Sequence, residues 1–279
     1  MSRVLRQRTL TALALAPAAV AMLLFAPTAA VAAVIALTCL GAIWEWTRLA
    51  GVGTRPRRAV VVAANLVLFA LLWTIRDAPV AWVVVGAGLA WWLLSLLWLR
   101  SFAYAAAPTP ENAAIKLVAC ELAVLPSWLA LMRLHGDADR GPVWALFAFA
   151  LIWTADIAAY FAGRRFGTTK LSPRISPNKT RAGVWGALAA GGVLALVCGW
   201  LLGERGARLV ALVALSLLAV LASIVGDLFE SLIKRQANAK DSGMLFPGHG
   251  GLLDRIDSLL AALPVFVAGK ALIDLVLAR

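Results

Sequence analysis

Residues 208–229 read RLVALVALSLLAVLASIVGDLF, and residues 230–257 continue ESLIKRQANAKDSGMLFPGHGGLLDRID. The first segment is apolar over a length that can cross the hydrocarbon core of a bilayer, whereas the second is dense in charged residues and glycine. Charged groups beside a membrane core are costly, so a cluster of them indicates a functional site. This pair of segments predicts a membrane helix followed by a polar site at the membrane surface.

The rest of the chain is also that of a membrane protein. Its 279 residues are 62% hydrophobic with a mean hydropathy of +0.88, which excludes the water-soluble classes. Apolar segments long enough to cross a bilayer run approximately over 9–26, 28–47, 59–75, 80–99, 114–134, 143–162, 183–202, 208–229 and 258–277. The first two favour uncleaved spans over a signal peptide. The sequence predicts an all-α polytopic membrane protein of about nine transmembrane helices. We expect a single domain over 1–279, with N-terminal spans in 1–142 and a catalytic half in 143–279.

Basic residues are distributed unequally between the two sides that nine spans define. One side receives 19 of the 26 lysines and arginines and the other receives 7, so the richer side is predicted to be cytoplasmic. The formal charge of +12 is explained by this bias, with no need for a nucleic-acid partner. The loops 163–182 and 230–257 fall together on the cytoplasmic side. The three cysteines have neither disulfide nor metal spacing.

Three aspartates in this region suit a metal. Asp227 ends an apolar helix, while Asp254 and Asp257 open the last span and share a face if 254–257 is helical. Together they form a hard oxygen cage suited to Mg²⁺, which binds between carboxylates and substrate phosphates. The alternatives are acids solvated by headgroup water, and a simple helix cap at Asp254.

A glycine-flanked histidine lies between these carboxylates. His249 precedes Gly250 and Gly251, whose backbone N–H groups can form an anion-binding nest. The alternative is a tight turn that re-enters the membrane.

A second polar cluster occupies residues 170–183. Its cations and hydroxyls, including Ser176, Lys179 and Thr180, suggest phosphate or nucleotide contacts, although a solvated cytoplasmic loop is the alternative. Asp156 lies inside the span 143–162 and needs a polar partner, for which a cation of another cluster is a candidate.

These motifs resemble those of the phosphatidate cytidylyltransferase family, also called CDP-diacylglycerol synthases. Residues 231–257 fit the signature of that family at every specified position, and residues 170–180 match its Lys-Leu-x-Pro-x-Ile-Ser-Pro-x-Lys-Thr element. Asp156 and Tyr160 match a further aspartate followed by Ala-Tyr. Thr154 and Ile157 depart from the residues that relatives often carry, which we interpret as packing variation.

The resemblance implies that phosphatidate and CTP give CDP-diacylglycerol and diphosphate in a Mg²⁺-dependent site. It implies that the metal carboxylates are Asp227, Asp254 and Asp257, with K⁺ as a candidate neighbouring ion. Phosphatidate carries its own anionic nucleophile, so the protein has only to bring two polyanions together and stabilise the leaving diphosphate. The residues assigned to catalysis are Lys234, Arg235, Lys240, Asp241, His249 and Arg255. Those assigned to substrate binding are Asp156, Ser176, Lys179, Thr180, Gly250 and Gly251.

The expected partners are CTP, phosphatidate and membrane lipids, and a homodimer is one candidate assembly. The expected location is a bacterial-type inner membrane with the site facing the cytoplasm. The competing function is a lipid or anion transporter, or a silent membrane scaffold. Transport is favoured by acids at the membrane midplane, whereas here the charges gather at the ends of the spans.

Overall fold

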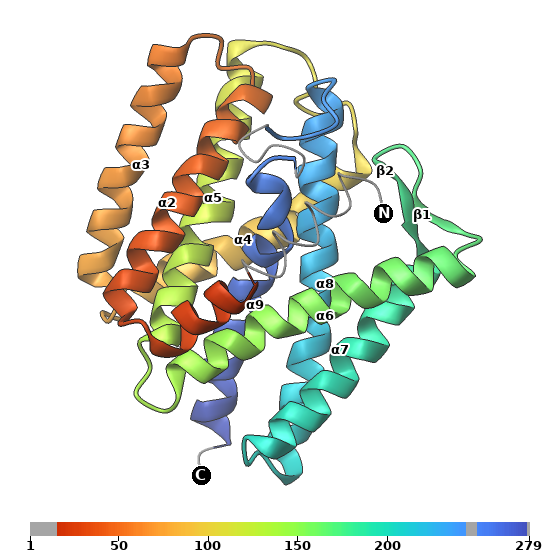
Figure 1. The fold of residues 1–279 in the computed structure, drawn as a ribbon. Helices are drawn as coiled ribbons and strands as arrows, with labels where there is room; N and C mark the ends of the chain where they lie inside the picture. The colour runs from red at the N-terminus through yellow and green to blue at the C-terminus, as the bar shows by residue number, and fades with distance from the viewer. Residues whose placement is uncertain (1–15, 244–249, 278–279) are drawn as a thin grey trace.

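The computed structural model describes residues 16–243 and 250–277. Within these residues, eight helices are long and apolar enough to cross a membrane, which confirms the all-α polytopic prediction (Figure 1). They are α2 (Thr28–Leu49), α3 (Arg55–Ile75), α4 (Ala81–Arg100), α5 (Pro110–His135), α6 (Gly141–Phe166), α7 (Arg181–Leu201), α8 (Gly206–Gln236) and α9 (Asp257–Val276). The predicted first span, 9–26, is represented by a shorter apolar helix, Ala16–Phe25, and its earlier residues lie outside the described ones.

Local sequence explains where several helices begin. Thr109 caps α5 by accepting a hydrogen bond from the Asn112 N–H at 3.3 Å, and Thr180 caps α7 by accepting one from the Gly183 N–H at 3.1 Å. The predicted span 114–134, which contains Lys116 and Glu121, forms the continuous helix α5. It is the most buried of the eight helices, and its Lys116 is buried among other helices.

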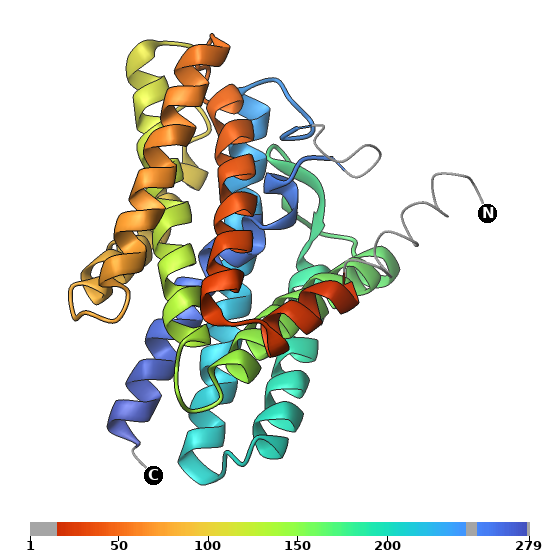
Figure 2. The same cartoon turned by 60° about the vertical axis from the view of Figure 1, so that its left-hand side comes forward.

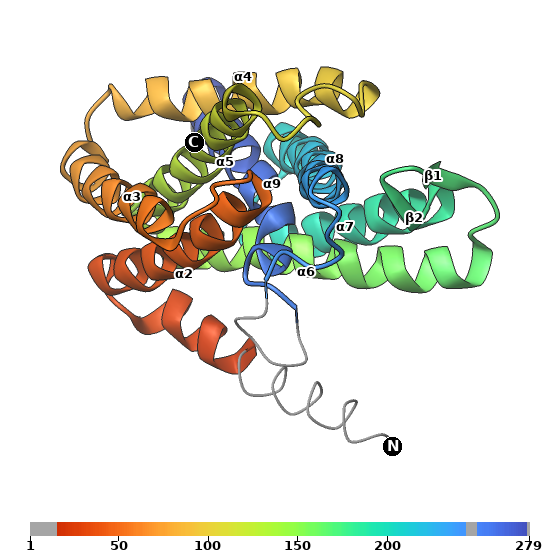
Figure 3. The same cartoon turned by 90° about the horizontal axis from the view of Figure 1, so that it is seen from above.

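The core of the molecule is formed where α5, α8 and α9 meet, with α9 between the other two (Figure 3). Phe229 of α8 is fully buried there against a group of tryptophans, Trp46, Trp91, Trp92 and Trp98. Pro264 has no N–H for the carbonyl of Leu260, and the Trp92 indole donates to that carbonyl at 3.1 Å instead. The N-terminal helices are therefore packed firmly against the C-terminal half.

Hydrogen bonds between loops show which loops share an end of the bundle. At one end Arg48 donates to the carbonyl of Ser242 at 2.6 Å, and Gln236 donates to that of Phe102 at 2.8 Å. At the other end Arg140 donates to the carbonyl of Leu202 at 3.0 Å. These pairings group the loops as the charge count predicted, with the richly basic ones together.

Three local features differ from expectation. The cluster 170–183 is not an open loop, because its first part forms an antiparallel hairpin of β1 (Lys170–Ser172) and β2 (Ser176–Thr180). The helix α8 continues to Gln236, so the loop predicted from residue 230 begins later. Asp254 and Asp257 do not share one α-helix, because the 3-10 turn η1 (Leu253–Arg255) ends before α9 begins. The hairpin lies beside the C-terminal end of α8, where Arg235 donates to the carbonyl of Ile175 (Figure 2).

Candidate active site

One face of α8 carries alternating acids and a lysine at helical spacing. Asp227, Glu230, Ser231 and Lys234 fall on this face because they are three or four residues apart. The Ser231 hydroxyl donates to Asp227 Oδ1 at 3.4 Å, and Lys234 forms an ion pair with Glu230. Glu230 is only 2% exposed, so this pair is buried at the end of the helix. Because α8 continues to Gln236, the helix holds all four side chains along one face.

A glycine brings the start of α9 against this face. A Cβ atom at Gly226 would overlap with the backbone carbonyl of Asp257, so the two helices approach more closely than any side chain would permit. Asp227 is the next residue, and its charge interacts electrostatically with that of Asp257. The contact explains how carboxylates from two helices come to lie near one another.

Asp254 is the most fully bonded of the acids. Its Oδ1 accepts from Lys234 at 2.5 Å, its Oδ2 accepts from the Gly251 N–H at 2.8 Å and from the Ser242 N–H at 3.0 Å, and the Ser242 hydroxyl lies 2.9 Å from Oδ2. Burial alone would raise the pKa of Asp254, but hydrogen bonds from Glu230 and Lys234, the charge of Lys234 and the Gly251 N–H together outweigh it. The pKa of Asp254 is therefore held below its ordinary value, and the group is anionic near neutral pH.

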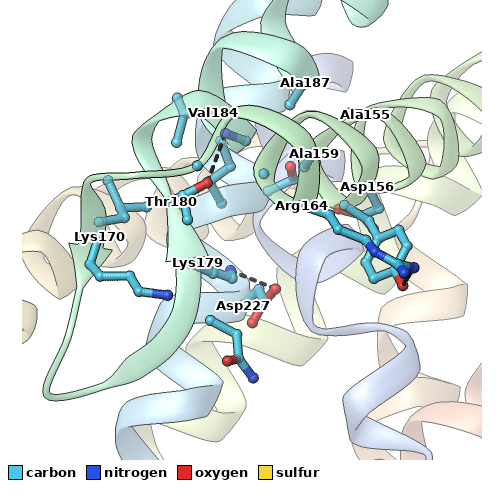
Figure 4. Close-up of a pocket in the computed structure, with 18 residues that line it drawn as sticks. Ala155, Asp156, Ala159, Arg164, Lys170, Lys179, Thr180, Val184, Ala187 and Asp227 are labelled. Carbon is cyan, nitrogen blue, oxygen red and sulfur yellow. Dashed lines mark hydrogen bonds and ion pairs between the residues drawn. The ribbon is translucent and has the colours of Figure 1, made fainter.

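The hairpin connects the second polar cluster to the first. Lys179 Nζ lies 2.5 Å from Asp227 Oδ2, and this ion pair is drawn in Figure 4. Ser176 begins the same strand, whereas the hydroxyl of Thr180 is occupied in capping α7. Thr180 is 5% exposed, so its hydroxyl supports the hairpin end. Of the three, Lys179 reaches the carboxylates directly.

A cavity of about 590 Å³ opens beside this ion pair. Its walls come from α6, the hairpin, α7 and α8, and Figure 4 shows Lys179, Asp227 and Asp156 among its lining residues. Asp156 lies within electrostatic reach of Asp227 and Lys179, and its pairing with a cation of another cluster stays a prediction. Small residues of α6 and α7, among them Ala159 and Ala187, make other parts of the wall apolar. The cavity thus has a charged end and an apolar wall.

The remaining signature residues have varied positions. Arg235 donates to the carbonyls of Ile175 and Ala239 at 3.3 and 3.4 Å, so it fastens the hairpin to α8. Lys240, Asp241 and Arg255 are exposed beside the network. Gly250 has a φ of +81°, a conformation that favours glycine, and Gly251 donates to Asp254. His249 lies outside the described residues, so its predicted role remains a prediction.

The acids of this region fit a divalent cation brought in with substrate. In the part of the chain that the structure describes, no group of three or more His, Cys, Asp or Glu side chains is arranged to hold a metal by itself. Mg²⁺ commonly takes only one or two carboxylates and completes its shell with water and substrate phosphates. Asp257 interacts with Asp227 as a like charge. This excess of negative charge suits a hard cation. The convergence of Asp227, Asp254 and Asp257 on one ion stays a prediction.

The sequence-based assignments include no residue of α2, yet two residues of this helix reach the site. Glu45 of α2 is 3% exposed, and its Oε2 accepts from the Ser242 hydroxyl and the Leu253 N–H, each at 2.9 Å. Arg48, one turn later, donates to the carbonyls of Asp241 and Ser242. The sequence Trp44-Glu45-Trp46 is typical of an aromatic pattern at a membrane interface, and this interpretation assigns no role to the acid. An acid within an apolar helix was the available signal.

Fold and site together define a polytopic membrane protein with an ionic, phosphate-compatible centre at one end of its helices. The chain belongs to the cytidylyltransferase family, whose sequence model matches residues 6–272. This membership confirms the resemblance drawn from the motifs, and with it the prediction of a nucleotidyltransferase rather than a transporter or scaffold.

Individual relatives agree with this placement. The chain is 36% identical to a phosphatidate cytidylyltransferase of Haemophilus influenzae over 94% of this chain and 97% of the relative. It is 41% identical to one of Pseudomonas aeruginosa over 95% of this chain and 96% of the relative. A third, from Brucella suis, is 51% identical over 49% of this chain and 50% of its own length. The first two similarities extend through the N-terminal half, which the motifs leave unassigned.

Proposed function

We propose that this protein transfers the cytidylyl group of CTP to phosphatidate, forming CDP-diacylglycerol and diphosphate. The observation that carries the proposal is the ion pair between Lys179 and Asp227, because it joins the basic hairpin to the carboxylates beside a partly apolar cavity. The names of the two relatives matched over nearly the whole chain support the same substrates. A lipid with an anionic headgroup matches a cavity that is charged at one end and apolar along its wall.

The reaction needs no nucleophile from the protein. A phosphate oxygen of phosphatidate forms a bond to the α-phosphorus of CTP, and the bond from that phosphorus to the β-bridging oxygen breaks, releasing diphosphate. The task of the chain is to hold two polyanions in line and to stabilise negative charge on the leaving group. Lys179 and Lys234 each contact a carboxylate in the structure, so both are fixed at the site as cations for the phosphates.

We extend the proposal to Mg²⁺, which Asp227 and Asp257 would hold together with the substrate phosphates. When bound, the ion supplies neutralisation of the charge that develops on the diphosphate. Asp254 is bonded to Lys234 and to the backbone of Gly251, so its part is to fix the lysine and the signature turn. A neighbouring K⁺ stays a prediction.

The proposed location is a bacterial-type inner membrane, with the hairpin and the end of α8 facing the cytoplasm. The charge distribution supports this orientation, since the basic loops meet at one end. CTP is a cytosolic solute, so the site must open on that side. A homodimer stays part of the proposal as a candidate assembly.

The test uses the purified full chain in detergent with labelled CTP, phosphatidate and Mg²⁺. We expect CDP-diacylglycerol and diphosphate to form in equal amounts. Diacylglycerol in place of phosphatidate is the matched control, because it has the same apolar chains without the phosphate nucleophile, and it should give no product. Absence of product from phosphatidate, in protein that remains monodisperse and folded, would contradict the proposal.

A further inference from the structure

The buried acid Glu45 lies in the N-terminal half, where no signature motif occurs. Its Oε2 accepts from the Ser242 hydroxyl and from the Leu253 N–H, both at 2.9 Å. These two donors lie on opposite sides of the segment 244–249 in the chain. We call the connection between α8 and α9 the signature loop. One carboxylate oxygen therefore accepts hydrogen bonds from both sides of this loop.

Two glycines make room for this carboxylate. A Cβ atom at Gly243 or at Gly251 would overlap with the side chain of Glu45. The loop backbone on both sides consequently lies directly against the acid. The described residues 242–243 and 251–253 therefore pack around this carboxylate.

Glu45 also reaches Asp254 through a single shared residue. The Ser242 hydroxyl lies 2.9 Å from Glu45 Oε2 and 2.9 Å from Asp254 Oδ2. Ser242 is fully buried, so both contacts are shielded from bulk solvent. Asp254 in turn holds Lys234 at 2.5 Å. A continuous chain of polar contacts thus connects α2 to the lysine of the signature.

Arg48, on the same face of α2, is hydrogen-bonded to the same loop. It is three residues after Glu45, and its Nη2 donates to the carbonyls of Asp241 and Ser242 at 3.2 and 2.6 Å. Glu45 accepts from loop donors while Arg48 donates to loop acceptors. The helix itself is anchored by Trp46, whose indole donates to the carbonyl of Lys116 at 3.0 Å.

We infer that Glu45 and Arg48 are positioning residues that hold the signature loop, and through Ser242 the carboxylate of Asp254, in the geometry that the reaction requires. The inference rests on the proposed function. It assigns a role in the reaction to the N-terminal half, which supplies the rigid support for a loop that the C-terminal half contributes.

The test compares Glu45→Ala with Glu121→Ala in the full chain. Glu121 is another acid inside the bundle, hydrogen-bonded to Asn65 at 2.9 Å, so its loss controls for a general effect on packing. We expect Glu45→Ala to lower kcat about ten- to a hundred-and-fifty-fold, the effect of losing a charge-assisted hydrogen bond. The KM for CTP should stay within about threefold, because the phosphate contacts remain. Glu121→Ala should retain the kcat of the unmodified protein.

A rescue variant and a coupling measurement separate positioning from mere stability. Glu45→Gln keeps an acceptor oxygen for Ser242 and Leu253, so its kcat should lie between those of the wild type and Glu45→Ala. Ser242→Ala should add little to the loss in Glu45→Ala, since both act through one contact, but should act independently of Glu121→Ala.

An arm that does not depend on turnover completes the experiment. Amide hydrogen exchange of residues 241–243 and 250–254 should increase in Glu45→Ala and remain as in the wild type in Glu121→Ala. Unchanged exchange in Glu45→Ala, or an equal kcat loss in both variants, would overturn the inference. If the wild type does not convert CTP and phosphatidate, the proposed function fails, and the exchange arm still decides whether Glu45 holds the loop.

Discussion

Lys179, at the end of the hairpin, forms an ion pair with Asp227 of α8, with 2.5 Å between Nζ and Oδ2. Both side chains are partly exposed, at 22% and 32%, so substrate can reach them. The pair lies beside the cavity and within electrostatic reach of Asp156. It is the point at which two polar clusters far apart in the chain become one site.

Removal of the lysine from this pair should impair the reaction without unfolding the protein. We expect Lys179→Ala to lower kcat/KM about ten- to a hundred-and-fifty-fold, because a charge-assisted phosphate contact contributes about 1.5–3 kcal/mol. Steady-state kinetics with both substrates measures this. Arg57→Ala is the control, since it removes an exposed positive charge at the same end of the bundle. Equal kinetics in Lys179→Ala and the wild type would show that Lys179 makes no contact that the reaction needs.

Turnover should depend on a divalent cation and on Asp257. Chelation with EDTA should abolish product formation, and added Mg²⁺ should restore it. Asp257→Asn should remove most turnover at saturating Mg²⁺ while the protein stays folded in detergent. Asp274→Asn is the matched control, because Asp274 is on the same helix but pairs with Arg208 and Lys270 at the other end. Full activity after exhaustive chelation would argue against the metal.

The close approach of α8 and α9 should tolerate no side chain at Gly226. Gly226→Ala places a methyl group against the Asp257 carbonyl, and overpacking of this kind costs about 1–3 kcal/mol. We therefore expect a lower thermal midpoint together with a lower kcat. Gly192→Ala provides the comparison, because its added Cβ meets only Leu217 at an ordinary 3.5 Å. If both variants behaved alike, the spacing of the helices would not govern the site.

The two ends of the bundle should be accessible from opposite sides of the membrane. Single cysteines at Lys170 and Lys240 should react with an impermeant maleimide from the cytoplasmic side only, whereas one at Asp139 should react from the other side. All three positions are exposed, and the native Cys39 and Cys120 are buried. A background with Cys198→Ser removes the remaining, partly exposed thiol. Labelling of Lys170→Cys and Lys240→Cys from different sides would contradict the shared site.

Much of the architecture follows from local sequence. Apolar length predicts seven of the eight helices to within about four residues at each end, because each residue that faces lipid contributes its own transfer free energy. The exception is α8, which continues into the charged segment as far as Gln236. The basic residues predict which loops share an end. The signature from 231 to 257 predicts the family, since its fixed polar residues are too numerous to arise by chance in an apolar chain.

The tertiary structure alone decided how the site is assembled. Glu45 and Leu253 are 208 positions apart, and no periodicity or motif relates them. The adjacency of Asp227 and Asp257 depends on a helix contact at Gly226, and the role of Arg235 depends on where the hairpin folds back. Helix formation in a membrane is set by the apolarity and backbone bonding of one segment, whereas contacts between segments depend on how all the helices pack at once. That is why the sequence by itself determined the spans and the family, and only the packed helices decided which charged groups meet.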